Sequence, residues 1–184
     1  MHFMTLFLVV TLCTCSGSVP SASGTPDRPA TSEAAAAATT SEMTFRLIDR
    51  GVLGRAANAD METADRTPMM EIASSGNRYE SLWRTHINDT PAPSVDFEKE
   101  SVVFLIMGPR PTGGYAVTPE SVTRSGNDLF VKTRIQEPEK GAMTTQAFTA
   151  PYAVIAVPMP RARAGRWVRS DGSLMAVENG GNVQ

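Results

Sequence analysis

Most of the chain after residue 43 alternates between apolar and polar positions in short runs. Alternation with a period of two predicts strands that bury one face, and it occurs over residues 44–49, 115–122 and 129–135. The run at residues 102–107 is apolar at every position, which predicts a central strand covered on both faces. The pattern therefore indicates a protein built mainly of strands.

Turn-forming residues separate these runs. Residues 125–128, with the sequence Ser-Gly-Asn-Asp, predict a hairpin turn between two of the alternating runs. Shorter apolar runs predict two further strands, over residues 69–73 and 146–157. Because Pro151 has no backbone N–H, we expect a bulge or an edge position in the second of these strands.

One short helix is predicted over residues 78–87. Asn77 is its candidate N-cap, with Glu80 as the capping-box partner. The side chains of one helix face follow the i, i+3, i+4, i+7 spacing: Tyr79, Leu82, Trp83 and His86. Short strands, frequent turns and a single helix predict a mainly β fold. The candidates are an antiparallel β-sandwich, its immunoglobulin-like form included, or a barrel-like sheet.

The first residues predict export. Residues 3–12 form an apolar run that is too short to span a bilayer and has the length of a signal-peptide core. The sequence around Cys15 resembles a bacterial lipoprotein box, so we assign residues 1–15 to a signal peptide and Cys15 to lipidation. Cys13 is the second candidate for the lipidated residue. A plain secretory signal cleaved within residues 16–23 is the alternative to lipidation.

Composition divides the rest of the chain into three parts. Residues 16–42 are rich in Ser, Thr, Pro, Gly and Ala and predict a flexible linker. Residues 43–160 form the predicted β-rich domain, and residues 161–184 are assigned to a C-terminal tail. The chain has 184 residues and a formal net charge of -2, which does not favour nucleic-acid binding. The predicted location is the bacterial cell envelope, where the protein is lipid-anchored, periplasmic or secreted.

Few residues of this chain have the chemistry of an active site. Beyond the predicted signal peptide it has no cysteine and one histidine, His86, which excludes zinc sites built from Cys and His. We interpret His86 as a packing residue on the helix face. Two acid pairs, Asp96 with Glu98 and Glu137 with Glu139, remain as acid–base candidates, and we interpret them as surface groups. We therefore predict no catalytic residue, no metal and no cofactor.

The segment at residues 108–115, Gly-Pro-Arg-Pro-Thr-Gly-Gly-Tyr, is the most informative motif. It joins two predicted strands, its prolines restrict the backbone, and its adjacent glycines allow close backbone approach. It lacks the Gly-Lys-Ser/Thr ending of a phosphate-binding loop. We interpret it as a partner-binding loop or, alternatively, as a demanding turn whose tyrosine caps the core. The candidate binding residues are Arg110, Pro111, Thr112, Gly113, Gly114 and Tyr115.

These motifs together resemble the C-terminal domain of PrcB-like proteins. The resemblance rests on residues 79–86, 95–97, 108–115 and 144–152, and it extends over residues 69–160. It implies an exported bacterial protein, often a lipoprotein. The founding member of the family belongs to a surface protease complex and is thought to help assemble or stabilise the protease.

A fainter likeness concerns the glycine loop alone. Residues 111–115 are similar to the Asn-Pro-Thr-Thr-Gly-Tyr loop of chagasin-type inhibitors, which are immunoglobulin-like domains that insert such loops into cysteine proteases. The first functional hypothesis is a non-enzymatic exported envelope protein that binds and stabilises another exported protein, with a protease as the implied partner. The alternatives are a chagasin-like protease inhibitor and a structural envelope domain that has no partner protease.

Overall fold

The computed structural model describes residues 40–53 and 67–179. All described residues belong to one unit of the chain. The predicted signal peptide, Cys15 and most of the predicted linker lie outside the described residues. Within the described ranges, no helix has the length and apolar character needed to cross a membrane.

Nine strands and one helix make up the described part of the chain. Their bounds are β1 Thr40–Met43, β2 Arg46–Leu53, β3 Met69–Ala73, α1 Gly76–His86, β4 Ser101–Ile106, β5 Ala116–Ser125, β6 Asp128–Gln136, β7 Ala150–Val157, β8 Ala164–Arg169 and β9 Leu174–Asn179. The predicted strand at residues 69–73, the central strand and the hairpin at residues 125–128 are confirmed. The expected long strand at residues 146–157 begins later, at Ala150.

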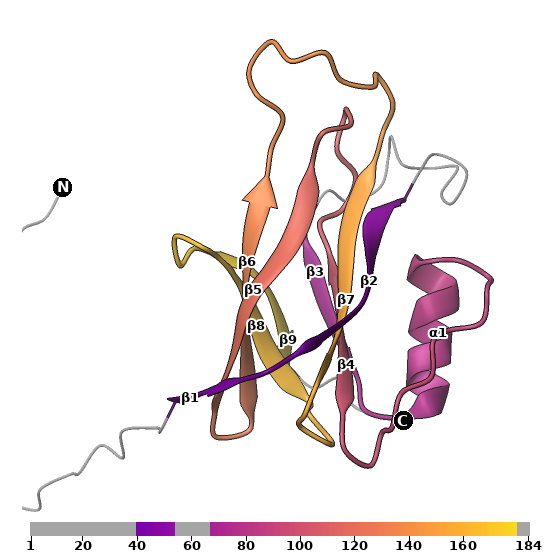
Figure 1. The fold of residues 1–184 in the computed structure, drawn as a ribbon, viewed down its shortest axis with the longest axis vertical. Helices are drawn as coiled ribbons and strands as arrows, with labels where there is room; N and C mark the ends of the chain where they lie inside the picture. The colour runs from indigo at the N-terminus through magenta and orange to yellow at the C-terminus, as the bar shows by residue number, and fades with distance from the viewer. Residues whose placement is uncertain (1–39, 54–66, 180–184) are drawn as a thin grey trace, which may run out of the picture. The chain divides into compact units, whose positions relative to one another are not determined.

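The strands form two sheets (Figure 1). One has the order β1-β5-β6-β8-β9, and the other has the order β2-β7-β4-β3. Every neighbouring pair is antiparallel except β6 and β8, which run parallel. The sheets do not close into a barrel, so the predicted β-sandwich is confirmed and the barrel-like alternative is wrong.

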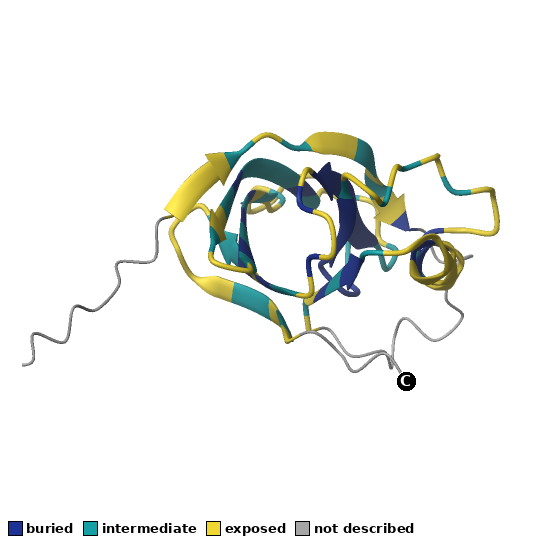
Figure 2. Ribbon diagram, turned by 90° about the horizontal axis from the view of Figure 1, so that it is seen from below, coloured by how far each residue is buried: buried dark blue, intermediate teal, exposed yellow. Residues whose placement is uncertain are grey.

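The continuous apolar character of β4 follows from its two covered faces. Val103 and Leu105 point into the core between the sheets, whereas Val102, Phe104 and Ile106 belong to a second core on the outer face of the four-stranded sheet. Strand β7 divides its side chains in the same way. Figure 2 shows the buried residues concentrated in the middle strands and the exposed residues on the periphery. Strands β4 and β7 therefore have a neighbouring strand on each side and a hydrophobic core on each face.

Helix α1 covers this outer core. It buries Tyr79, Leu82 and Trp83 against the sheet, as the spacing predicted. Its N-cap is Ser75, which is extended and makes no side-chain capping bond, so the assignment to Asn77 was wrong. The helix starts earlier because only two residues separate it from the end of β3, and its first hydrogen bond runs from the N–H of Tyr79 to the carbonyl of Ser75.

The domain extends beyond both predicted boundaries. Strand β1 begins within the segment assigned to the linker, which covers three of its four residues, and pairs with β5. Strands β8 and β9 lie within the segment assigned to the tail, and they form a hairpin at the edge of the five-stranded sheet. Trp167 explains this, because its buried indole N–H donates to the hydroxyl of Thr133 at 2.7 Å. The neighbouring arginines concealed that inward alternation: the guanidinium of Arg166, one residue away, stacks on Phe130 instead.

Pro151 contradicts the expected edge or bulge position. It lies in β7, which is central and pairs with both β2 and β4. Its carbonyl still accepts a hydrogen bond from the N–H of Met107 at 2.9 Å. In a regular antiparallel pair residue 151 would also donate to the carbonyl of Met107, and a proline has no hydrogen to do so. A different donor therefore takes that position, as the loop geometry shows.

Candidate functional site

The β5–β6 hairpin brings two loops together at one end of the sandwich. Its last pair is Ala116 with Gln136. The chain therefore enters β5 and leaves β6 side by side, and residues 108–115 lie next to residues 137–149 (Figure 1). We call these two segments the paired loops. The residues that the sequence singled out form only one half of this structure.

Four hydrogen bonds join the paired loops. Arg110 and Thr149 exchange two backbone bonds, with N···O distances of 2.6 and 3.0 Å. The N–H of Gly113 donates to the carbonyl of Thr145 at 2.9 Å. The hydroxyl of Thr149 donates to the carbonyl of Thr112 at 2.8 Å. The glycine loop is therefore held in one form by its neighbour.

Gly114 is required for both conformation and space. Its φ of 90° is one that L-residues rarely adopt. A Cβ at this position would lie 3.0 Å from the Cβ of Pro138 and 3.3 Å from the Cγ2 of Thr144. Gly113 differs, because its Cβ would meet Thr145 at an ordinary 3.4 Å and its φ is not positive. The two adjacent glycines thus have different roles: Gly113 donates a backbone hydrogen bond to the second loop, and Gly114 supplies the positive φ and the close approach to Pro138.

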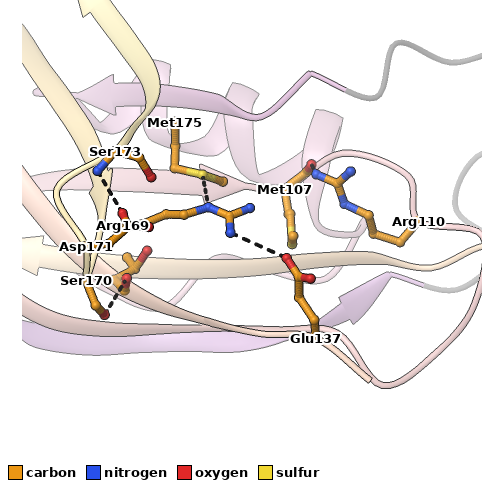
Figure 3. A network of polar contacts seen from close by, with 9 residues as sticks. Met107, Arg110, Glu137, Arg169, Ser170, Asp171, Ser173 and Met175 are labelled. Carbon is orange, nitrogen blue, oxygen red and sulfur yellow. Dashed lines mark hydrogen bonds and ion pairs between the residues drawn. The ribbon is translucent and has the colours of Figure 1, made fainter. Parts of the chain in front are cut away.

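Arg110 is the donor that replaces the missing proline hydrogen. Its Nη2 donates to the carbonyl of Met107 at 2.8 Å. That carbonyl faces Pro151, which cannot donate, so the guanidinium completes the end of the β4–β7 ladder. Figure 3 shows Arg110 with its guanidinium turned toward the backbone of Met107. A residue predicted to bind a partner therefore has a structural role within its own loop.

A second arginine braces the other loop. Arg169, at the end of β8, reaches Glu137 at the start of the 137–149 loop with an N···O distance of 3.4 Å. Its Nε also donates to the sulfur of Met175 in β9. Figure 3 shows Arg169 between these two partners. The C-terminal hairpin, which the sequence suggested was a tail, thus supports the base of the paired loops.

The tips of the paired loops are exposed. Pro111 and Gly114 are exposed in the first loop, and Tyr115 is half-buried against the core between the sheets. Met143 in the second loop is fully exposed, with 103% of its reference surface accessible. An apolar side chain without cover, on loops that are themselves held by hydrogen bonds, suits recognition of another surface better than it suits chemistry.

The acid–base candidates do not converge. All four carboxylates are exposed and lie in two different loops. Asp96 pairs with Lys99 at 2.7 Å, and this hydrogen bond lowers the pKa of Asp96. Glu137 is paired with Arg169, as described above. Among residues 40–53 and 67–179, no group of three or more His, Cys, Asp and Glu side chains is arranged to hold a metal ion.

His86 contacts an acidic side chain in addition to packing on the helix face. Its Nε2 lies 3.5 Å from the carboxylate of Glu71 in β3, which Arg78 also approaches at 3.4 Å. The hydrogen bond with His86 is the main reason why the pKa of Glu71 is lowered. This cluster joins α1 to the edge of the four-stranded sheet.

Sequence reasoning found the first loop and missed the second. As candidate site residues, residues 137–149 supplied only the acid pair of Glu137 and Glu139, and Met143 was not singled out. The hairpin turn at residues 125–128 held the necessary signal, because its register places residue 136 opposite residue 116. Whatever follows β6 must then lie beside the loop that precedes β5.

Comparison with protein families points to the same region. Residues 101–158 match the family model described as PrcB C-terminal. This chain contains a PrcB-like C-terminal domain. The matched segment begins with β4 and ends just after β7, so it contains both paired loops. Residues 79–86 and 95–97, which contributed to the resemblance in the sequence, lie outside it.

The match describes a family that is not a known enzyme family. No curated protein and no solved structure matches the chain significantly. The identification of the PrcB-like domain therefore rests on the family model together with the fold around residues 101–158.

Proposed function

We propose that this PrcB-like protein is a non-enzymatic protein of the bacterial cell envelope that binds and stabilises another exported protein through its paired loops. The observation that carries the proposal is the combination at their tips. The loops are joined by four hydrogen bonds, and they leave Met143 fully exposed. The family resemblance favours a protease as the partner.

The physical argument concerns the cost of binding. Ordering a flexible loop on association costs free energy, and a loop that is already fixed avoids most of that cost. Gly114 and the bonds to Thr145 and Thr149 supply this rigidity before any partner arrives. Met143 then offers an unbranched apolar anchor that adapts to the shape of a partner pocket.

The place of action follows from the predicted export signal. In this proposal Cys15 is lipidated and anchors the protein to a membrane, and the linker lets the domain reach a partner beyond the lipid surface. Secretion without lipidation leaves the same docking surface but no membrane anchor. Mass spectrometry of the mature N-terminus separates these two forms.

The test of the proposal is an affinity pull-down from the native envelope with the tagged, membrane-extracted protein. The test variant is Met143→Ser, and the control is Leu174→Ser, which removes another exposed apolar side chain, in β9. We expect the wild type and the control to capture the same protein and Met143→Ser to lose it. Equal capture by all three would contradict docking at the paired loops.

The chagasin-like alternative makes a different prediction. It requires the purified protein to inhibit papain-like proteases, with loss of inhibition on substitution of Thr112 or Tyr115. Both residues are partly buried, and the carbonyl of Thr112 is bonded to Thr149, which favours a fixed loop over one that inserts deeply into a cleft. Inhibition across a small panel of such enzymes would replace the docking proposal with this one.

A further inference from the structure

A concave site separate from the paired loops lies on the outer face of the four-stranded sheet, beside α1. It is a cavity of about 600 Å³ between α1 and the segment at residues 89–97. One wall is a stripe of the helix that includes Tyr79 and Trp83, and the other includes Pro91, Pro93 and Phe97. This volume is in the range of ligand sites, and the paired loops contribute no residue to it.

Two of the residues that line this cavity have a buried hydrogen-bond donor without a partner among the described residues. The hydroxyl of Tyr79 and the indole N–H of Trp83 are buried and unpaired among the described residues. Burial raises the pKa of Tyr79 to about 12, so the hydroxyl keeps its proton at neutral pH. Trp167, the other tryptophan, donates to Thr133 in the core between the sheets. Buried polar groups are normally paired, so two unpaired donors beside one cavity indicate an absent acceptor.

We propose that this cavity binds an extended, proline-containing peptide segment of another protein, whose backbone carbonyls accept hydrogen bonds from Tyr79 and Trp83. An indole N–H can only donate, and the protonated phenol is free to do so. The occupant must therefore present acceptors within a mainly apolar body. Tertiary amides of a proline-rich segment do this, because their carbonyls are free and their rings are apolar.

The shape and charge of the walls agree with such an occupant. Tyr79 is in ring contact with Trp83 and Phe97, at centroid distances of 5.8 and 5.7 Å, which gives an aromatic surface of the kind that proline-rich segments dock on. The wall runs along α1 from Gly76 to Arg84, a rise of about 12 Å. That length accommodates roughly four residues of extended chain. Arg84 is paired with Glu80 at the rim, and Asp89 is the third charged residue of the lining.

The segment opposite the helix is held to it by side-chain packing. Residues 91–95 have no regular secondary structure, and within the described residues no hydrogen bond joins them to α1. Ala92 and Val95 pack against the outer core that α1 covers. In this proposal the peptide displaces that packing to reach the two buried donors, which breaks no hydrogen bond between the segment and α1.

The two tryptophans provide the test. The chain has only two, so a ¹H–¹⁵N spectrum of the full-length protein contains two indole signals. We would titrate it with a decaproline peptide, using a Gly-Ser decapeptide as the control. The Trp83 signal should move downfield and saturate as its N–H gains an acceptor, while the Trp167 signal stays in place. An unchanged Trp83 signal at millimolar decaproline, or equal shifts with both peptides, would overturn the proposal.

A conservative variant keeps the test independent of folding. Tyr79→Phe preserves the ring and removes a donor that has no partner among the described residues. It should weaken peptide binding, followed through the Trp83 signal, by roughly fivefold, the worth of one hydrogen bond, without lowering the thermal stability of the free protein. Wild-type affinity in this variant would overturn the assignment of the Tyr79 donor. Met143→Ser should leave the titration unchanged, which separates this site from the paired loops.

Discussion

The two ends of the β5–β6 hairpin are held together in different ways. At one end β5 and β6 are joined by a tight turn, where Gly126 has a φ of 60° and an added Cβ would meet no atom within 4 Å. At the other end the chain diverges into the paired loops, where Gly114 has a φ of 90° and lies against Pro138. Gly126 supplies only a positive φ, whereas Gly114 supplies a positive φ and also allows the two loops to approach closely.

The two ends differ in how many contacts they make beyond those needed to connect the strands. The tight turn connects its strands with two intervening residues. The paired loops are much longer, and they are held by backbone bonds, by Thr149 and by Arg110. Long loops are usually mobile unless they have a function that needs a fixed shape. The end with the paired loops also has the fully exposed Met143, which is why we propose it as the docking end.

The largest expected loss of stability is at Gly114, and Gly126 in the tight turn is its comparison. Gly114→Ala should lower the free energy of unfolding by about 2–3 kcal/mol, because it adds an unfavourable backbone conformation and a close contact with Pro138. Gly126→Ala should cost about 1 kcal/mol, because only the conformation is unfavourable. Urea unfolding of both variants measures the difference. Equal losses would mean that the contact between the loops contributes nothing.

The next effect tests whether Arg110 replaces a missing backbone donor. Arg110→Met should cost about 1–2 kcal/mol, since it leaves the carbonyl of Met107 without its donor. In a Pro151→Ala background, where residue 151 regains an N–H opposite that carbonyl, the same change should cost less. Strictly additive losses in this double-mutant cycle would contradict the substitution of one donor for the other.

A smaller effect concerns the side-chain bond between the loops. Thr149→Val removes the hydroxyl that donates to the carbonyl of Thr112 and keeps the shape of the side chain, so a loss of about 1 kcal/mol is expected. Thr145→Val is the matched control, because this side chain is exposed and Thr145 bonds to the other loop through its backbone carbonyl, which the change retains. Thermal unfolding should place the control near the wild type, and a reversed order would be evidence against the bond.

The smallest effect on stability is expected at Met143. Met143→Ser should change the free energy of unfolding by less than about 0.5 kcal/mol, because the side chain is fully exposed. The value of this variant lies in the contrast with Gly114, since it leaves the fold intact and removes the apolar tip. A marked loss of stability would mean that Met143 packs within the domain, and it would remove the case for a docking anchor.

The sequence was informative where a local pattern determined the structure and uninformative where distant residues did. The alternation over β5 and β6 and the apolar run of β4 identified those strands because burial alone sets their pattern. Strand β8 was missed because Arg163, Arg166 and Arg169 concealed the inward alternation of Gly165 and Trp167. Nothing local in residues 137–149 indicated that their partners are residues 110–113, which only the hairpin register brings near.

The role of Arg110 shows the same limit within the candidate site. Its basic charge and its place in an exposed motif suggested contact with a partner. Its actual partner is the backbone of Met107, and the reason lies in Pro151, some forty residues later in the chain. Sequence reasoning selected this loop as the candidate site, but the contacts that each of its residues makes depend on segments far apart in sequence.

Site-specific photo-crosslinking in cells that make the protein tests the central claim most directly. A photoreactive amino acid replaces Met143 in one variant, Pro111 in a second and Asn127, at the opposite end of the hairpin, in a third. We expect positions 143 and 111 to crosslink to the same exported protein and position 127 to give no such adduct. Crosslinking of that protein mainly at position 127, or no adduct at either paired loop, would contradict the claim that these loops form the docking surface.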